Sequence, residues 1–599
     1  LFEKTVGNTN YNQTRNKYVK AVRKAKKKFS RNAARKTKGG VWKVINSRQA
    51  QDWNKLVEGT DFSNHVELAE GFANHFRSKI ENLNLTPDPS SIFDSLQNNS
   101  LWDIHPCTKD EVAKAIDCLK PKTSSGLDQI SNRLIKELKF VAIDAITYVF
   151  NRSITENIFP DIWKTAKIIP TFKKGSRNDI SNYRPVCLFS NLGKLLEVVI
   201  RNQIIPHLDS QLPTNIFGSR TGCSTHDAIC HIMDKIHGYR AEGFFVAAVA
   251  LDASSAFDTL SHDVILNSLR ICGSGPNFIN WSRSFLSNCT NIVQIEDASS
   301  SPWVTKIGSA QGRRLSGDYY NVGTMSQAVL SKASDFAGYV DDGMDVVHGR
   351  TIEECNRKIS SLIDERILWY NQIGISLNIA KTELIGFGFV PDPISIGNTT
   401  ISPSSEITFL GVKIQSDLRW KNHVTTICNR IRSAAGRIRV DGRNFDITDK
   451  CKLFSGSILG LINSNRLVNL PSATKSELLD LQTAMNAGIR AVMGIPRYGL
   501  SNITAIRKKL NLPSVEDLKN RIVSVEAWKR LASYNEAHEC TGPTTRARSN
   551  LKIPLPDLRG HRGKMTNAFL TPAWNNLPLP IKKMQSFTNV KFHIKKLFM

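Results

Sequence analysis

The sequence predicts an α+β fold in which buried strands bring acidic residues together between basic, helical flanks. The unbroken apolar run 244–251 ends on Asp252, and such a run is typical of a central strand buried on both faces. Residues 336–347 contain two β-prone runs separated by Asp-Asp-Gly at 341–343, which predicts a hairpin with a tight Asp-Gly turn. Helically spaced apolar residues on both sides of this region predict the flanking helices.

Three carboxylates, those of Asp252, Asp341 and Asp342, are expected to meet at one edge of the predicted sheet. Adjacent carboxylates repel each other, so a cation is expected beside them. Hard divalent cations prefer oxygen ligands, and this set suits a two-metal site for phosphoryl transfer. A lone Asp-Asp-Gly is more often a solvated turn, and the separate strand that ends on Asp252 favours the metal site. Asp258 and Asp345 lie nearby in the sequence and are expected to be structural.

Several segments resemble, in the expected order, the motifs of reverse transcriptases from non-LTR (LINE-type) retrotransposons. Tyr339-Val-Asp-Asp342 resembles the Tyr-x-Asp-Asp box of that family, and residues 251–262 resemble its first catalytic motif. The further matching segments are 166–175, 182–185, 217–225, 310–312, 377–382 and 409–412. The resemblance covers residues 105 to 425 in detail, and the ordered series is far more specific than any one motif.

The resemblance implies a right-hand polymerase with fingers, palm and thumb. The expected regions are a basic helical N-terminal region (1–80), a linker (81–106), fingers (107–243), a palm with the catalytic carboxylates (244–415), a helical thumb (416–530) and a basic C-terminal region (531–599). The sequence shows no internal repeat, so these regions are expected to be distinct structures.

The individual elements follow from local patterns. Residues 11–40 are densely basic with apolar residues at helical spacing, which favours a helix for nucleic-acid contact or nuclear targeting over a merely solvated face. Residues 81–106 are rich in Asn, Ser, Pro and Leu, which is typical of a linker. Short strands around the Gly397-Asn398 turn in 394–414 resemble the family's primer-grip sheet. One apolar stripe and several arginines in 424–439 predict a thumb helix.

The resemblance also implies roles for residues around the nucleotide. Phe257 would be an aromatic gate that excludes a 2′-hydroxyl, with a core aromatic as the alternative. Gln311 and Gly312 would position the incoming base. After them the chain departs from the family, because Arg313-Arg314 and Asp318 replace small or apolar residues. Charges beside the nucleotide pocket could impair it, so either a lineage variant or a decayed copy is compatible with the sequence.

Four basic residues complete the implied site. Lys173, Lys174 and Arg184 resemble the residues of the fingers that clasp the triphosphate, and the planar fork of an arginine suits phosphate. Lys381 would protonate the departing pyrophosphate as a general acid. A solvated surface position is the alternative for each lysine.

The composition points to a polyanionic partner. Lys and Arg total 80 against 53 Asp and Glu, which gives a net charge of +27 in 599 residues. The longest apolar run, 244–251, is far too short to span a bilayer, so nucleic acid is favoured over membrane. Eleven cysteines without a Cys-x-x-Cys pair fit a reducing compartment, and the nucleus and cytoplasm are the expected locations.

These observations predict an RNA-directed DNA polymerase that extends a DNA primer on an RNA template. Its substrates would be dNTPs, and its metal would be Mg²⁺, with Mn²⁺ as the alternative, held by Asp252, Asp341 and Asp342. A catalytically silent nucleic-acid-binding remnant and a group-II-intron-type maturase are the alternatives. No acid and His constellation for a nuclease is found outside the polymerase core, so a separate endonuclease domain is expected to be missing from this chain.

Overall fold

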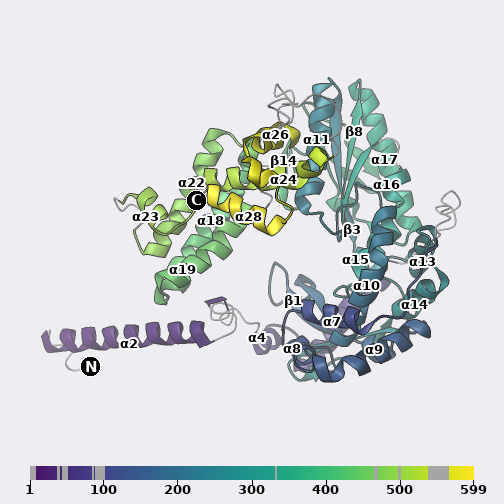
Figure 1. Cartoon of the computed structure of the whole chain (residues 1–599), viewed down its shortest axis with the longest axis horizontal. Coiled ribbons are helices and arrows are strands. Elements are labelled where there is room, and N and C mark those ends of the chain that lie inside the picture. The colour runs from purple at the N-terminus through teal and green to yellow at the C-terminus, as the bar shows by residue number, and fades with distance from the viewer. Residues whose placement is uncertain are drawn as a thin grey trace. The chain divides into compact units, whose positions relative to one another are not determined.

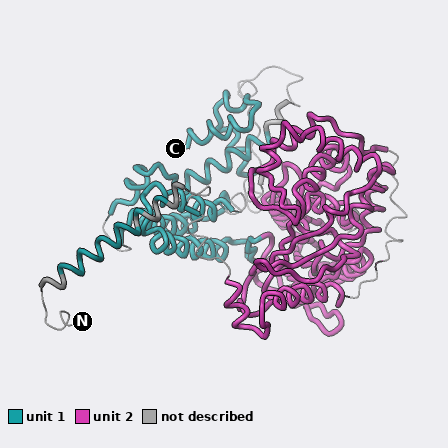
Figure 2. The backbone as a smooth tube through the Cα atoms, turned by 90° about the horizontal axis from the view of Figure 1, so that it is seen from below, with its two compact units in different colours: residues 1–51, 411–599 teal, residues 52–410 magenta. Residues whose placement is uncertain are grey.

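The computed structural model describes residues 9–36, 41–42, 52–83, 87, 101–330, 334–464, 470–496, 501–536 and 566–598. The chain forms two compact units (Figure 2). One comprises residues 52–410, and the other comprises residues 1–51 and 411–599. Among the helices of the described residues, none is both long enough and apolar enough to cross a bilayer.

The unit 52–410 is built around an antiparallel sheet with strand order β10-β3-β8-β7. Its strands are β3 (Phe245–Ser254), β7 (Asp335–Tyr339), β8 (Asp342–Gly349) and β10 (Glu383–Phe387), and β9 (Ser376–Leu377) pairs with the end of β3. Residues 246–251 of β3 are all buried, which confirms the predicted central strand. Helices α11 (Thr225–Ala241) and α17 (Ile352–Gln372) pack against this sheet (Figure 1).

The predicted hairpin is present, but its turn lies earlier than expected. Tyr339 pairs with Asp342, so Val340 and Asp341 form the turn and Asp342 already belongs to β8. Val340 has φ +59°, which is rare for a β-branched residue. The turn packs closely against a distant segment, since a Cβ on Gly218 would lie 2.4 Å from the Val340 nitrogen. The prediction of an Asp-Gly turn was wrong because it considered only local propensity.

A second sheet has the order β2-β1-β4-β5, with β6 also paired to β4. Its strands are β1 (Ala166–Phe172), β2 (Tyr183–Leu188), β4 (Cys289–Ile295), β5 (Ala298–Ser299) and β6 (Trp303–Thr305). Helix α5 (His65–Glu81) begins at the cap residue Asn64 and packs its apolar face on β4 and β5. Phe72 of α5 meets Tyr183 of β2 at 5.1 Å between ring centroids, so α5 is part of the same core.

The remaining helices of this unit pack in one large apolar core, except the first of them, which packs with α5 in the core of the second sheet. They are α4 (Trp53–Glu58), α7 (Lys109–Cys118), α8 (Asn132–Glu137), α9 (Lys139–Thr155), α10 (Asn191–Gln211), α12 (Ala256–Thr259), α13 (His262–Ile271), α14 (Pro276–Leu286), α15 (Ser316–Thr324) and α16 (Gln327–Leu330). A capping box between Thr108 and Glu111 starts α7. The short strands β11 (Ile394–Ile396) and β12 (Thr399–Ile401) form the predicted hairpin around Gly397-Asn398, and β13 (Glu406–Phe409) follows.

The other unit is mainly helical. Its elements are α2 (Thr9–Lys36), β14 (Val412–Gln415), α18 (Lys421–Asp441), α19 (Ile447–Phe454), α20 (Gly460–Asn463), α22 (Lys475–Met493), α23 (Ile503–Lys509), α24 (Val515–Glu536), α26 (Thr566–Asn576), α27 (Leu579–Lys582) and α28 (Phe587–Leu597). The predicted apolar stripe of the thumb helix is the buried face of α18, which packs on α22. Trp574 is fully buried in a cluster between α24, α26 and α28.

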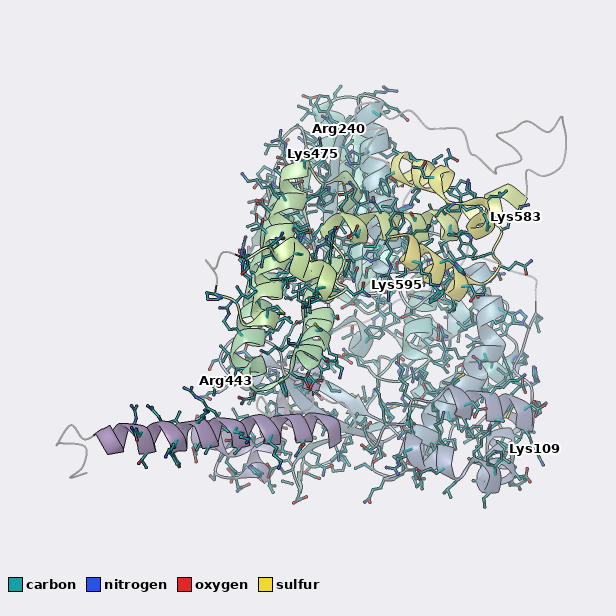
Figure 3. All side chains as sticks on the ribbon, turned by 60° about the vertical axis from the view of Figure 1, so that its left-hand side comes forward. Lys109, Arg240, Arg443, Lys475, Lys583 and Lys595 are labelled. Carbon is teal, nitrogen blue, oxygen red and sulfur yellow. The ribbon has the colours of Figure 1, made fainter. Side chains whose placement is uncertain are left out.

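The predicted basic helix is confirmed as α2. Seven of its basic side chains are described and exposed, namely Arg15, Lys17, Lys20, Arg23, Lys24, Lys26 and Lys28. Basic side chains also project from the C-terminal helices, among them Lys583 and Lys595 (Figure 3). Most of the predicted linker, residues 84–86 and 88–100, lies outside the described residues. The bounds of the fingers, palm and thumb stay predictions.

Candidate active site

Two of the three predicted carboxylates are direct neighbours in the sheet β10-β3-β8-β7. Asp252 near the end of β3 is the antiparallel partner of Asp342 at the start of β8, and Asp341 precedes it in the turn. Burial raises the pKa of the Asp342 carboxyl to about 6, and the negative charges of Asp341 and Asp252 act in the same direction. The sheet register thus concentrates three acidic groups at one edge, as the sequence predicts.

The segment 215–218 supports this edge from the outside. The Phe217 nitrogen donates to the Gly338 oxygen at 2.8 Å, and the Gly338 nitrogen donates to the Asn215 oxygen at 3.0 Å. Because Gly218 has no side chain, the segment can approach the Val340 turn. The motif that contains Phe217 and Gly218 therefore contributes backbone contacts to the β7–β8 hairpin.

Lys381 lies beside the first carboxylate. It ends the short helical turn η4 (Ile379–Lys381), and its Nζ lies 3.2 Å from Oδ2 of Asp252. The Asn378 nitrogen donates to the Asp252 backbone oxygen at 2.8 Å, which fixes this turn to the end of β3. The predicted general acid is thus held next to the carboxylates, and its role stays a prediction.

The donor set suits a hard divalent cation. Within the described part of the chain, no three His, Cys, Asp or Glu side chains are arranged to hold a metal ion as they stand. The chemistry nevertheless fits, because Asp252, Asp341 and Asp342 supply only carboxylate oxygens. Burial, and after it the charges of Asp341 and Asp252, raise the pKa of Asp342, and a cation beside these groups would oppose that rise. Lys381 supplies a positive charge beside Asp252 in this structure.

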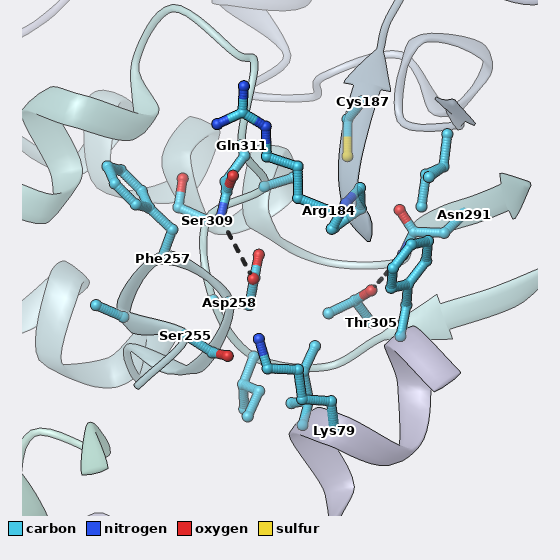
Figure 4. A pocket seen from close by; sticks show the side chains of 18 of the residues that line it. Lys79, Arg184, Cys187, Ser255, Phe257, Asp258, Asn291, Thr305, Ser309 and Gln311 are labelled. Carbon is cyan, nitrogen blue, oxygen red and sulfur yellow. Dashed lines mark hydrogen bonds between the residues drawn. The ribbon is translucent and has the colours of Figure 1, made fainter. Parts of the chain in front are cut away.

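A cavity of about 670 Å³ lies next to these acids, within the unit 52–410. Its lining includes Asp252 and Asp341 together with five other predicted site residues, namely Lys173, Arg184, Phe257, Gln311 and Lys381. Figure 4 labels three of them, Arg184, Phe257 and Gln311. Lys174, Gly312 and Asp342 do not line it. Lys174 is exposed in the loop after β1, which agrees with its solvated alternative.

Phe257 lines this cavity while its ring also packs on the core. Its ring centroid lies 4.9 Å from that of the buried Tyr320. Tyr320 belongs to α15, so the wall formed by Phe257 is backed by a fully packed aromatic. Such support would keep the Phe257 ring in place against a nucleotide that carries a 2′-hydroxyl. The gate and the core aromatic are therefore compatible roles for one ring.

The turn at Gln311 and Gly312 approaches β2 closely. Gly312 has φ +102°, and a Cβ there would lie 2.8 Å from the Cys187 carbonyl oxygen. Any other residue at this position would therefore be strained and would clash with the backbone of β2. Gln311 is exposed at the tip of the turn, and its Nε2 donates to Oδ2 of Asp258 at 3.5 Å.

Asp258 and Lys79 are cavity residues that the sequence did not reveal. Asp258 was expected to be structural, yet it lines the cavity, with Lys79 of α5 reaching toward it (Figure 4). Burial raises the pKa of the Asp258 carboxyl to about 6, against the charge of Lys79. In the sequence, the signal for a role of Asp258 in the cavity was its position directly after Phe257. For Lys79 no local signal exists, because α5 is far away in the sequence.

The Asp258 carboxyl should make stability depend on pH. The unfolded chain releases this proton near pH 4 and the folded chain near pH 6, so the free energy of unfolding falls as the pH rises between these values. Asp258→Asn should therefore be more stable than wild type at pH 8, by up to about 3 kcal/mol, since one pKa unit corresponds to about 1.4 kcal/mol. This gain in the free energy of unfolding should be smaller at pH 5. Urea unfolding at both pH values measures it.

The exposed Asp297 in the β4–β5 turn provides the control, because Asp297→Asn removes a carboxylate outside the cavity. If Asp258→Asn has the same advantage at pH 5 and pH 8, the carboxyl does not titrate in this range. That outcome would contradict the account of its burial.

Comparison with known proteins decides the family of this region. Residues 172–414 match the profile of the family described as "Reverse transcriptase (RNA-dependent DNA polymerase)". These residues form a reverse transcriptase domain. The match includes both strands that carry the acids, and also Phe257, Gln311 and Lys381. This match confirms the predicted right-hand fold class, and together with the relatives described next it confirms the resemblance to non-LTR retrotransposon enzymes.

Relatives of the reverse transcriptase domain come from mobile elements. The chain is 24% identical over 520 residues to "Probable RNA-directed DNA polymerase from transposon BS" of Drosophila melanogaster, covering 81% of this chain and 56% of that protein. It is 25% identical to "RNA-directed DNA polymerase from mobile element jockey" of Drosophila funebris, covering 82% of this chain and 56% of that protein. The chain thus spans about half the length of these curated relatives.

Among solved structures, telomerase of Candida tropicalis in complex with a fragment of telomeric RNA is similar. It has a TM-score of 0.36 and 12% identity, and the match covers 80% of this chain and 70% of that one. The apo telomerase of the same organism has a TM-score of 0.31 and 15% identity, with 49% and 62% covered.

Proposed function

We propose that this chain is an RNA-directed DNA polymerase of a non-LTR retrotransposon that extends a DNA primer on an RNA template. The observation that carries the proposal is the register pairing of Asp252 with Asp342 beside a cavity lined by Phe257 and Gln311. Acids from two strands of one sheet provide the charge for metal binding, and the cavity next to them has room for a nucleotide.

Asp252, Asp341 and Asp342 would hold divalent metal ions, which reverse transcriptases use, and Mg²⁺ is the proposed ion, with Mn²⁺ as the alternative. When bound, the metal supplies activation of the primer 3′-hydroxyl and stabilisation of the leaving pyrophosphate. Lys381 stands ready to donate a proton at the same place, since its ammonium lies 3.2 Å from Asp252. Arg184 and Lys173 present positive charge to the cavity for the triphosphate of a dNTP.

The wider chemistry of the chain supports nucleic-acid partners. The net charge of +27 and the exposed basic residues of α2 favour binding of an RNA template and a DNA primer or target. The proposed locations are the nucleus and cytoplasm. A nuclease that nicks target DNA is proposed to lie outside this chain.

Primer extension tests the proposed function. Purified protein is supplied with poly-rA, oligo-dT and dTTP in Mg²⁺, and the products are separated by length. Extension beyond the primer supports the proposal. Absence of extension in both Mg²⁺ and Mn²⁺, by protein that binds the template, would favour the catalytically silent remnant.

Replacing the gate residue should relax sugar selection. Phe257→Val removes the ring that lines the cavity, so ribonucleotides should enter with little loss of dNTP use. The ratio of kcat/KM for dGTP to that for rGTP should fall by about tenfold or more, since a pocket discriminates through the shape of its wall. Phe257→Tyr keeps a ring and should keep the ratio. An unchanged ratio in Phe257→Val would show that the ring serves only core packing.

Binding of RNA should weaken with salt, and α2 should contribute to the slope. Each phosphate contact to a single strand adds about 0.7 to the slope of log K against log salt. Deleting residues 1–40 should reduce this slope by about two or more, since seven exposed basic side chains are lost. Filter binding over a salt series measures the slopes. Tyr18→Ala changes an exposed, uncharged residue of the same helix and should leave the slope unaltered.

A further inference from the structure

Two charged residues follow the Gln311–Gly312 turn and are buried. Arg313 is 7% exposed and Asp318 is 5% exposed. A buried charge without a partner would destabilise this part of the domain by several kcal/mol. The sequence left open whether these residues disable the pocket, and their surroundings bear on that question.

Arg313 lies in a box of aromatic rings. Its guanidinium carbon is 4.3 Å from the ring centroids of both Phe189 and Phe285, and 5.3 Å from that of Phe159. Its Nη2 lies 3.5 Å from the Lys164 backbone oxygen. Ring faces attract a guanidinium, and this attraction strengthens when water is excluded. The box therefore compensates part of the cost of burying the charge.

Helix α10 supplies the opposite charge. Glu197 is 1% exposed, and its Oε2 accepts hydrogen bonds from the backbone nitrogens of Arg314 and Leu315. Burial raises the pKa of Glu197, and the Arg313 charge is the strongest influence that opposes this rise. The carboxylate also sits at the N-terminal end of α15, where negative charge is favourable.

The second charge has its own partner one turn further along α10. Nε of Arg201 lies 2.7 Å from Oδ2 of Asp318, and its Nη2 lies 3.0 Å from Oδ1. Glu197 and Arg201 are four residues apart and therefore share one face of the helix. That face presents a carboxylate toward Arg313 and a guanidinium toward Asp318. The charges on this face of α10 are therefore complementary to those of Arg313 and Asp318.

Contacts on both sides hold the loop that contains Arg313 in place. Ser316 Oγ donates to the Ala310 oxygen at 2.7 Å and lies 3.0 Å from Ser309 Oγ. On the other side, Gly312 rests against the Cys187 carbonyl. Gln311 stands at the tip of this loop and lines the nucleotide cavity. Directly behind the tip, Arg313 is largely buried and also lines this cavity.

We propose that Arg313 is a positioning residue that fixes the Gln311–Gly312 turn against the incoming nucleotide, with Glu197 and the three phenylalanine rings as its anchor. The inference rests on the proposed function, because it assigns a role within the nucleotide site. The Arg201–Asp318 pair fastens the start of α15 in the same way. Arg313 and Asp318, together with their partners, thus stabilise the wall of the pocket.

Steady-state primer extension on poly-rA tests the role of Arg313. Arg313→Leu should raise the KM for dTTP tenfold or more while kcat stays within threefold, because the loop loses its anchor but the carboxylates are untouched. Arg313→Lys keeps the charge beside Glu197 and should recover part of the increase. Arg314→Leu makes the same change of charge at an exposed neighbour and should leave KM and kcat as in wild type.

Folding is measured on the same variants, because Arg313→Leu removes the stronger of the two cationic charges that act on the buried Glu197, the other being that of Lys194. The double variant Glu197→Gln with Arg313→Leu removes both charges and keeps an amide oxygen for the two backbone nitrogens. A raised KM in either folded leucine variant supports the proposal, and a wild-type KM overturns it. Failure of both leucine variants to fold also overturns it, because Arg313 would then serve the fold. Wild-type protein without any extension would contradict the proposed function instead.

Discussion

Asp252→Ala should abolish primer extension, reducing the rate by about 10³-fold or more, since preorganised charge at the reacting centre supplies most of the acceleration. The residue lies at the register position opposite Asp342, so its loss removes one wall of the proposed metal site. Binding of the RNA template should stay within threefold of wild type, because it depends on basic residues dispersed over the chain. Gel-resolved extension and filter binding measure the two effects separately.

Asp297→Ala is the matched control, because it removes an exposed carboxylate from the β4–β5 turn of the same unit. Its rate should equal that of wild type. Extension by Asp252→Ala above the level of heat-killed protein would contradict the assignment of this carboxylate. Loss of template binding in Asp252→Ala would indicate that the variant is misfolded. Circular dichroism would detect this folding defect.

Asp345→Ala should destabilise the unit 52–410 by about 3–5 kcal/mol, because it leaves a buried guanidinium without its partner. Asp345 in β8 and Arg366 in α17 have side chains that are 0% and 1% exposed. Two bonds join them, Nη2 to Oδ1 at 2.7 Å and Nε to Oδ2 at 3.1 Å. The Ser334 hydroxyl also donates to this carboxylate at 2.7 Å. Urea unfolding followed by tryptophan fluorescence measures the loss.

The double variant Asp345→Leu with Arg366→Met replaces the pair by apolar side chains and should be closer to wild type than Asp345→Ala. Glu137→Ala breaks the exposed pair with Arg133 and should leave the unfolding midpoint unchanged. Equal midpoints for Asp345→Ala and wild type would show that this pair contributes nothing to the stability of the fold beneath the β7–β8 hairpin.

Patterns confined to one element allowed reliable predictions. The apolar run that ends on Asp252 predicted β3, because a strand buried on both faces needs apolar residues throughout. The apolar stripe at helical spacing predicted α18 in the same way. Asp345 was expected to be structural, and its buried pair with Arg366 confirms this expectation. In each case the signal lies within the element itself.

Features that depend on contacts between distant segments could not be predicted. The hairpin turn falls on Val340 and Asp341, where it lies against Gly218, a residue more than a hundred positions earlier in the chain. The environment of Asp258 depends on Lys79 of α5. The charge of Asp318 looked disruptive because its partner on α10 is recognisable only once the chain has folded.

Copying of a heteropolymeric RNA tests the central claim most directly. Purified wild-type protein extends a DNA primer annealed to an RNA of defined, mixed sequence, and the DNA product is sequenced. We expect a product complementary to the RNA, made only when all four dNTPs and Mg²⁺ or Mn²⁺ are present and lost in Asp252→Ala. A product unrelated to the template, or one formed equally by Asp252→Ala, would contradict the claim that this palm is an RNA-directed DNA polymerase.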